Sequence, residues 1–280
     1  MRLEQFSIEV PGQQTGPAVL TLYQIDNINV APEKKRPLVI ICGGGGYSRI
    51  SEREKEPILL RFLAMGCSAC LLEYSVAPNR FPTSLLELAS AVALARKNSS
   101  QWNIDPDKIV TCGFSAGGHL AASLGVFWNR ELAYGPLGLK PEDIRPNGQI
   151  LGYPVISSGP KGHRRSICEL LGEKADDPEA LELVSLEKQV TADTPKTFLW
   201  HTRTDQTVPV ENSLLLAQAF VEQGVEFELH IYPMGVHGLS LSTAETAGEN
   251  ERHFEPYCST WVDMVKAWME QNFQCLSMKK

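Results

Sequence analysis

The sequence lacks a long hydrophobic run, and it lacks the dense positive charge that nucleic acids and anionic membranes attract. No stretch approaches the roughly 18 consecutive apolar residues of a membrane-spanning helix. The formal net charge is −7, and the compact basic clusters are confined to residues 34–36 and 161–165, which are typical of solvated loops. The composition therefore predicts neither nucleic acid nor membrane as a partner.

Signals for export and for disulfide bonding are also missing. The first ten residues include Glu4 and Glu9 and no continuous apolar stretch followed by small residues, so they do not resemble a secretory signal. The seven cysteines are odd in number. Several of them, such as Cys42, Cys70 and Cys112, lie in apolar segments, which is typical of a reducing compartment. We expect a cytoplasmic protein.

The sequence also lacks ligand residues at the spacing of a metal site. His201 and Asp205 could supply two ligands, but no third or fourth ligand follows at a readable spacing, and there is no His-Glu-x-x-His run. We expect no metal and no cofactor.

What is present is an alternation of apolar runs and helical patterns through a chain of 280 residues with 43% apolar content. This alternation predicts a mostly parallel sheet with helices on both faces. No linker rich in Ser, Gly or Pro divides the chain, so we expect one α/β domain over residues 1–280. The expected strands are 19–25, 38–42, 68–74, 109–112, 148–151, 197–201 and 226–232. The expected helices include 85–96, 211–223 and 257–273, the last with Trp261, Val265 and Trp268 on a buried face.

The segment 153–195 is the least regular part of the pattern. Glycine and proline interrupt it, and only short helical pieces are legible at 167–171 and 180–187. Because it joins two expected strands, we predict a small lid or pocket wall that includes the loop 159–165.

The most informative motif is Gly113-Phe114-Ser115-Ala116-Gly117, which follows one apolar run and precedes a stretch of small residues. A serine on a tight turn between strand and helix projects its hydroxyl, and flanking glycines avoid collisions with neighbouring backbone. The first amides of the following helix favour negative charge at that point. We predict that Ser115 is a nucleophile.

A nucleophilic serine needs a base to accept its proton and an acid to orient that base. His237 lies between glycines after the expected strand 226–232 and is the predicted base. Asp205 follows the expected strand 197–201 and is the predicted acid, with Asp193 and Glu211 as reserves. The order Ser, Asp, His is the one that accompanies this type of turn.

The glycine run at residues 43–46 follows the expected strand 38–42 and can offer bare amides to an oxyanion. A dinucleotide site is the alternative interpretation. It is disfavoured because Ser48 occupies the third glycine position and the next helix begins only near Ser51-x-x-Glu54, read as a capping box, or at Pro57. His119 lies one helical turn beyond the nucleophile, where we expect it to pack beneath the turn.

Taken together, these motifs resemble the α/β-hydrolase superfamily, and within it small bacterial esterases related to hormone-sensitive lipase and to acetyl xylan esterase. The likeness covers about residues 36–270, and its most specific parts are Gly44-Gly45-Gly46-Tyr47, Phe114-Ser115-Ala116-Gly117-Gly118-His119, His201-Thr202-x-x-Asp205-x-x-Val208-Pro209 and His237-Gly238.

The resemblance implies an oxyanion hole formed by the amides of Gly45, Gly46 and Ala116. It also implies a sheet of eight strands in which the second is antiparallel. Lipase-like members usually have histidine before three glycines, whereas this chain has Gly43 there. That departure is closer to carbohydrate acetylesterases, and it leaves open what supports the glycine loop.

The resulting hypothesis is a serine carboxylesterase that hydrolyses short acyl esters, acetyl esters first, of small molecules that include carbohydrates. Tyr47 and Tyr153 are the predicted pocket walls, because each follows an expected strand. A serine peptidase of the same fold and a binding protein without activity remain as alternatives. The sequence does not fix an oligomeric state.

Overall fold

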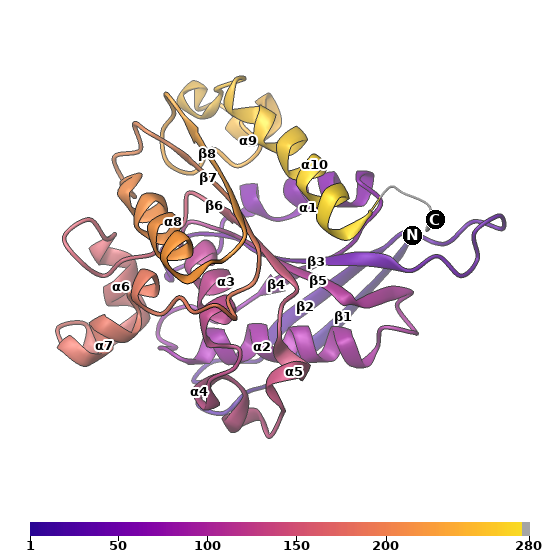
Figure 1. Cartoon of the computed structure of the whole chain (residues 1–280), viewed down its shortest axis with the longest axis horizontal. Coiled ribbons are helices and arrows are strands. Elements are labelled where there is room, and N and C mark those ends of the chain that lie inside the picture. The colour runs from indigo at the N-terminus through magenta and orange to yellow at the C-terminus, as the bar shows by residue number, and fades with distance from the viewer. Residues whose placement is uncertain (276–280) are drawn as a thin grey trace.

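The computed structural model describes residues 1–275 and contains an eight-stranded sheet in the order β1-β2-β4-β3-β5-β6-β7-β8 (Figure 1). β1 pairs antiparallel with β2, and β2 pairs antiparallel with β4, whereas all other neighbours are parallel. The strands are β1 (Arg2–Ile8), β2 (Ala18–Gln24), β3 (Arg36–Cys42), β4 (Ser68–Glu73), β5 (Ile104–Phe114), β6 (Gly148–Gly152), β7 (Thr197–Thr202) and β8 (Phe227–Tyr232). The expected α/β-hydrolase fold, with its antiparallel second strand, is confirmed.

The seven strands expected from apolar runs all form, with ends that shift by a few residues. β1 was missed because it is an edge strand whose side chains alternate between half-buried and exposed positions, so it has no apolar run. β3 shows the opposite pattern, since all seven of its residues are buried. Continuous burial is expected where helices cover both faces of parallel strands.

Two groups of helices cover the two faces of the sheet. α1 and α10 lie on one face, above the strands in Figure 1, and α2, α3 and α8 lie on the other. Their bounds are α1 (Glu56–Ala64), α2 (Thr83–Lys97), α3 (Ala116–Phe127), α8 (Glu211–Gln223) and α10 (Trp261–Phe273). The helix expected at 257–273 begins at Trp261 instead, because residues Cys258–Thr260 form a separate 3-10 turn.

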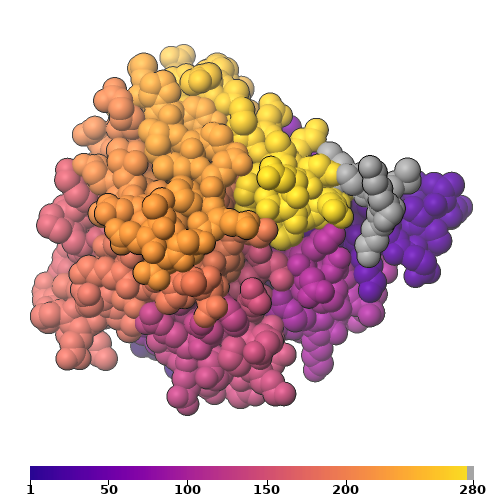
Figure 2. Space-filling view, viewed as in Figure 1, coloured from indigo at the N-terminus to yellow at the C-terminus, as the bar shows by residue number. Residues whose placement is uncertain are grey.

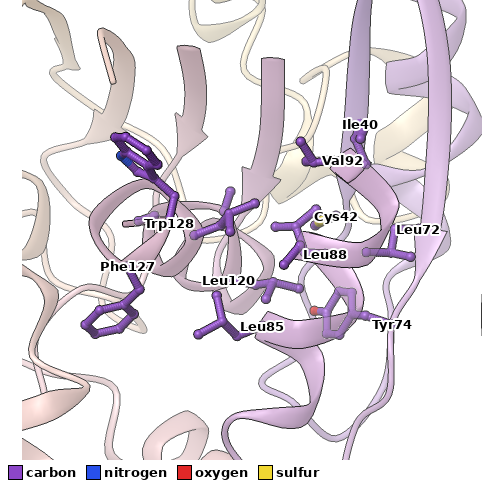
Figure 3. Packing of buried hydrophobic residues seen from close by; sticks show 14 of the residues in the cluster. Ile40, Cys42, Leu72, Tyr74, Leu85, Leu88, Val92, Leu120, Phe127 and Trp128 are labelled. Carbon is purple, nitrogen blue, oxygen red and sulfur yellow. The ribbon is translucent and has the colours of Figure 1, made fainter. Parts of the chain in front are cut away.

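Each face has its own hydrophobic core. On the α2 side, Leu85, Leu88 and Val92 recur at helical spacing and pack towards Ile40 of β3 and Leu120 of α3 (Figure 3). On the α10 side, Trp261 stacks on Trp200 of β7 with ring centroids 5.2 Å apart. Trp261, Val265 and Trp268 are all buried, as their spacing predicted.

Shorter helices complete the layers. They are α4 (Glu131–Tyr134), α5 (Pro141–Ile144), α6 (Arg164–Leu171), α7 (Pro178–Leu183) and α9 (Ala244–Ala247). The segment 153–195 holds α6 and α7. α6 begins three residues before the expected piece 167–171, and α7 ends at Leu183, after which a 3-10 turn follows at Leu186–Lys188.

The indigo N-terminal residues and the orange residues of the C-terminal half lie at opposite ends of the face seen in Figure 2. Across residues 1–275, none of the helices is both long enough and apolar enough to cross a bilayer.

Candidate active site

The turn between β5 and α3 holds Ser115 in a strained conformation. Its φ is 53° and its ψ is −119°, a region that residues other than glycine rarely adopt. A Cβ on Gly113 would lie 2.0 Å from the carbonyl oxygen of Gly117, and a Cβ on Gly117 would lie 2.1 Å from that of Cys42. Both glycines are therefore required by backbone contacts, as the motif predicted.

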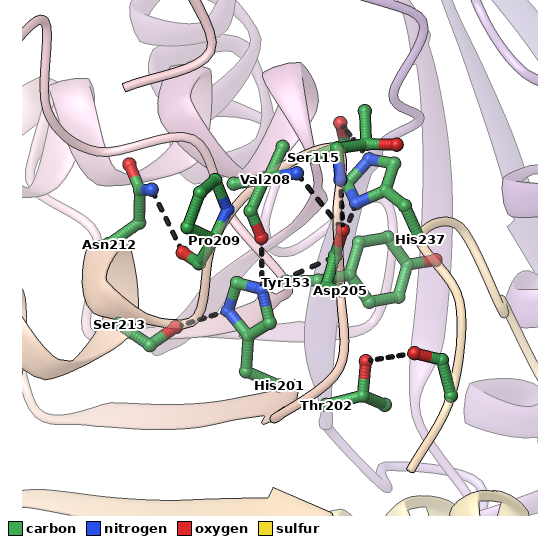
Figure 4. Close-up of polar contacts among 12 residues, drawn as sticks. Ser115, Tyr153, His201, Thr202, Asp205, Val208, Pro209, Asn212, Ser213 and His237 are labelled. Carbon is green, nitrogen blue, oxygen red and sulfur yellow. Dashed lines mark hydrogen bonds and ion pairs between the residues drawn. The ribbon is translucent and has the colours of Figure 1, made fainter. Parts of the chain in front are cut away.

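Ser115, His237 and Asp205 meet at the carboxyl ends of three parallel strands (Figure 4). The Ser115 Oγ lies 2.7 Å from the Nε2 of His237, and the Nδ1 of His237 lies 2.6 Å from the Oδ2 of Asp205. With its Nδ1–H donated to the carboxylate, the imidazole leaves Nε2 free to accept the serine proton. The structure thus brings together the three residues that the sequence proposed as a triad.

The Asp205 carboxylate is buried and fully engaged. Its Oδ1 accepts the backbone N–H groups of Thr207 and Val208 at 2.9 and 3.0 Å. Burial by itself would raise the pKa of Asp205, but hydrogen bonds from His201 and His237 outweigh it, so the pKa lies below its usual value. The group is therefore ionised whenever His237 is able to act as a base.

His201 is a second imidazole at this carboxylate. In the sequence it stands in the family-like motif with Asp205 and as an incomplete pair of metal ligands, and neither interpretation predicted this contact. It is fully buried, and its Nε2 lies 2.9 Å from the Val208 carbonyl oxygen and 3.4 Å from the Oδ2 of Asp205. Its Nδ1 lies 2.7 Å from the Oγ of Ser213. The feature of the sequence that could have indicated this contact is the position of His201 at a strand end, four residues before Asp205.

The glycine loop after β3 lies directly against Ser115. A Cβ on Gly44 would come within 2.8 Å of the Ser115 Cβ and of the Phe114 carbonyl oxygen. Gly45 and Gly46 have φ values of 134° and 69°, which favour glycine. The loop therefore lies against Ser115, and Ala116 follows Ser115 at the first position of α3.

Glu54 holds the glycine loop in place through a hydrogen bond to Gly44, a role that its sequence position did not predict. Its side chain is buried, and its Oε2 accepts the Gly44 N–H at 2.6 Å while its Oε1 accepts the Tyr153 hydroxyl at 2.7 Å. The expected capping box does not form, because the Ser51 side chain makes no capping hydrogen bond. Gly43 is also held, since its carbonyl accepts the Tyr74 hydroxyl at 2.7 Å.

Tyr47 and Tyr153 do not line the cavity above Ser115, which corrects their prediction as pocket walls. Both are buried. The Tyr47 hydroxyl bonds the Nδ1 of His119 at 2.9 Å, and the Tyr153 ring packs edge-on against His237 with centroids 5.1 Å apart. Both side chains therefore point to buried partners, and Tyr153 contacts the site only through the His237 ring.

His119 packs beneath Ser115, as expected, and it is fully buried. Its Nε2 lies 3.0 Å from the Val184 carbonyl. Burial lowers the pKa of His119 to about 4, so the ring is neutral at neutral pH.

A cavity of about 350 Å³ opens above Ser115 and His237. Gly45 and Gly46 line one side, and His163 and Arg165, from the start of α6, line another. The segment 153–195 thus contributes residues to the cavity wall, through the end of the loop 159–165.

The two reserve acids lie elsewhere. Asp193 accepts a hydrogen bond from Asn129 at 2.9 Å, and Glu211 forms an ion pair with Lys161 at 2.7 Å. Neither contacts His237. In residues 1–275, no three His, Cys, Asp or Glu side chains converge as metal ligands do.

The model of the BD-FAE family matches residues 27–220 of the chain. The chain belongs to the BD-FAE family. It is 40% identical over 219 residues to endo-1,4-beta-xylanase B of Butyrivibrio fibrisolvens, covering 75% of this chain and 34% of that protein. It is 29% identical over 205 residues to the acetylxylan esterase of Xylanibacter ruminicola, covering 71% of this chain and 40% of that protein. This BD-FAE chain therefore spans about a third to two fifths of those two relatives.

Solved structures align over nearly the whole BD-FAE chain. The acetyl ester-xyloside bifunctional hydrolase of Caldicellulosiruptor lactoaceticus superposes with a TM-score of 0.79 at 38% identity, covering 93% of this chain and 90% of that one. The carboxylesterase Cest-2923 of Lactobacillus plantarum superposes with a TM-score of 0.86 at 26% identity over the full length of both chains. The resemblance to esterases of the α/β-hydrolase fold is confirmed.

Proposed function

We propose that the protein is a serine carboxylesterase that hydrolyses small esters with short acyl groups, acetyl esters in particular. The observation that carries the proposal is the continuous hydrogen-bonded chain from the Ser115 Oγ through His237 to Asp205, with distances of 2.7 and 2.6 Å. Such a chain activates a hydroxyl that is otherwise a poor nucleophile.

The reaction begins when the Ser115 Oγ attacks the ester carbonyl carbon and passes its proton to the Nε2 of His237. Asp205 stabilises the imidazolium that results, because its carboxylate is already ionised and bound to Nδ1. The carbon–oxygen bond to the alcohol then breaks, and His237 returns the proton to the departing oxygen. Water repeats the sequence at the acyl-enzyme and releases the acid.

The amides of Gly45, Gly46 and Ala116 are the proposed donors to the oxyanion. Support comes from the contact of the glycine loop with Ser115 and from the position of Ala116 at the start of α3. Backbone donors fixed before the reaction stabilise charge at little reorganisation cost. The same donors would serve both tetrahedral intermediates.

The polar lining of the cavity supports a short acyl group and a hydrophilic alcohol. Among the described residues that line the cavity above Ser115, none has an aliphatic side chain. A long acyl chain would lose the burial free energy of about 0.8 kcal/mol per methylene in such a site. The names of the acetylxylan esterase and the acetyl ester-xyloside hydrolase point in the same direction. We assign residues 153–195 to the wall of this pocket within one catalytic domain.

The proposal is tested by steady-state kinetics on phenyl acetate, phenyl octanoate, acetylated xylose and an aminoacyl anilide. We expect hydrolysis of the acetyl esters, little of the octanoate and none of the anilide. Ser115→Ala should lose at least about 10⁴-fold in kcat while keeping its melting temperature. The control Ser259→Ala removes a hydroxyl that bonds only the Pro256 carbonyl in the described structure, and it should retain full activity.

A fluorophosphonate probe adds a readout that does not depend on substrate choice. It should label the wild type and Ser259→Ala but not Ser115→Ala. Equal labelling or equal turnover of the Ser115→Ala protein would refute the proposed nucleophile.

A further inference from the structure

The cavity above Ser115 carries an excess of positive charge that the protein does not neutralise. We infer that its substrates bear a carboxylate in the alcohol or in the acyl part, so that the enzyme prefers esters of acidic molecules over neutral ones. This inference rests on the proposed esterase function and narrows its substrate class.

Three arginines line the cavity, and they come from two separate parts of the chain. Arg49 follows the glycine loop, Arg53 lies in the 3-10 turn beside Glu54, and Arg165 lies in the first turn of α6. The chain as a whole has a formal net charge of −7, so the convergence of three arginines on one cavity departs from its overall balance.

None of the three arginines is neutralised by an ion pair with an acidic side chain in the part of the protein that the structure describes. Within residues 1–275, no Asp or Glu forms an ion pair with Arg49, Arg53 or Arg165. By contrast, Arg164, the neighbour of Arg165 that does not line the cavity, pairs with Asp176. The lining cations are thus available to a ligand.

Arg53 is held in place without being neutralised. Its Nε donates to the carbonyl of Thr246, while its Nη2 is buried and has no hydrogen-bond partner in the described structure. A buried guanidinium nitrogen without an acceptor carries a free-energy cost that a bound anion nearby would reduce.

Acidic side chains are fewer than arginines on the lining of the cavity. Glu54 is the acidic residue among the lining residues, and both of its oxygens accept hydrogen bonds, from Gly44 and Tyr153. Asp205 lies behind His237 with its carboxylate fully buried. The fixed charge on the lining is therefore positive.

The two additional histidines do not change this balance. Burial, together with nearby positive charge, lowers the pKa of His163 and that of His253. Both rings are therefore neutral at neutral pH, and the charge of the cavity comes from arginine. Guanidinium groups suit a carboxylate because they can donate two parallel hydrogen bonds to it.

The carboxylate can belong to the alcohol or to the acyl part of the ester, and two matched substrate pairs separate these sources. The alcohol pair is 3-carboxyphenyl acetate and its neutral isostere 3-carbamoylphenyl acetate. The acyl pair is the phenyl monoester of adipic acid and phenyl 5-carbamoylpentanoate. Each is assayed for kcat and KM at pH 7.5, at low and at high ionic strength.

We expect the wild type to favour the carboxylate over the amide in at least one pair by about tenfold in kcat/KM, mainly through KM. The preference should shrink in high salt, because the arginines are partly exposed. In Arg49→Gln/Arg165→Gln the ratio should fall to near one. Both side chains are exposed, so the double variant should fold. The control Arg61→Gln, an exposed arginine of α1 outside this cavity, should keep the ratio.

Equal kcat/KM within both pairs in the wild type, or a preference that survives in the double variant, would overturn the inference. Either result leaves the proposed esterase function intact, because the neutral esters are still hydrolysed. If no ester of either pair is hydrolysed, or if Ser115→Ala hydrolyses them as well as the wild type, the proposed function itself is wrong.

Discussion

Replacing Glu54 with glutamine tests whether the support of the glycine loop controls catalysis. The substitution keeps the shape of the side chain but removes its charge and turns one acceptor into a donor. The Gly44 N–H, 2.6 Å from one oxygen, can only donate, so the glutamine oxygen must face it, and the Tyr153 hydroxyl, 2.7 Å from the other oxygen, must then change from donor to acceptor. Both hydrogen bonds also lose the negative charge that strengthens them. Glu54 therefore acts as a positioning residue for two parts of the site at once.

The magnitude follows from the geometry. A buried hydrogen bond to a charged group contributes roughly 1.5–3 kcal/mol, so the free energy of unfolding of Glu54→Gln should fall by about 2 kcal/mol. The loop that Glu54 holds contains the proposed oxyanion donors, and small displacements of such donors reduce turnover strongly. We expect kcat for phenyl acetate to fall by about 10- to 100-fold, while KM changes by less than about threefold.

The assay measures kcat and KM separately, together with urea unfolding. Glu52→Gln is the matched control, because Glu52 lies in the same 3-10 turn but is exposed and pairs with Lys55 at 3.0 Å. The control should change neither kcat nor stability by a measurable amount. If Glu54→Gln loses stability but keeps its kcat within about twofold, Glu54 has a purely structural role and the reasoning fails.

Three further predictions concern the acid, the turn and the buried imidazole. Asp205→Asn should lower kcat on the order of 10⁴-fold by reversing the tautomer of His237, whereas Asp193→Asn should leave kcat unchanged; similar losses in both would contradict the assignment. Gly117→Ala should destabilise the fold by about 3 kcal/mol or more, since its Cβ would lie 2.1 Å from a β3 carbonyl oxygen, while Gly16→Ala meets no atom within 4 Å and should be neutral in thermal unfolding. His119 has its pKa lowered from 6.5 to about 4, so the unfolded chain takes up its proton first and stability should fall by about 3 kcal/mol as the pH drops from above 6.5 towards 4. Urea unfolding of the wild type and His119→Gln across this range measures that loss, and equal pH dependence in the two proteins would exclude His119 as its source.

The site was predictable wherever chemistry depends on local sequence. Ser115 could be recognised because the glycines on both sides of it are required by backbone contacts within the turn and with the adjacent strand. Asp205 and His237 could be found because each follows a strand that was expected from its hydrophobic pattern, and parallel strands bring their carboxyl ends to one edge. Whether the three side chains reach one another was decided only by the folded chain.

Local sequence did not predict where the side chains of Tyr47, Tyr153 and Glu54 point. Tyr47 and Tyr153 each follow a strand, as pocket residues do, yet both turn inward to buried partners. Glu54 stands in a pattern typical of a helix cap, yet its carboxylate is held by Gly44 and Tyr153, and Tyr153 is 99 residues away along the chain. Local propensity carries no information on contacts of that range.

The sequence by itself determined the alternation of strands and helices and the strained turn at Ser115, because hydrophobic periodicity and backbone sterics act over a few residues. The tertiary structure decided the strand order, the support of the glycine loop and the convergence of Arg49, Arg53 and Arg165 on one cavity. These features depend on distances between segments that lie far apart in the chain, and such distances are set only when the whole sheet packs against its helices.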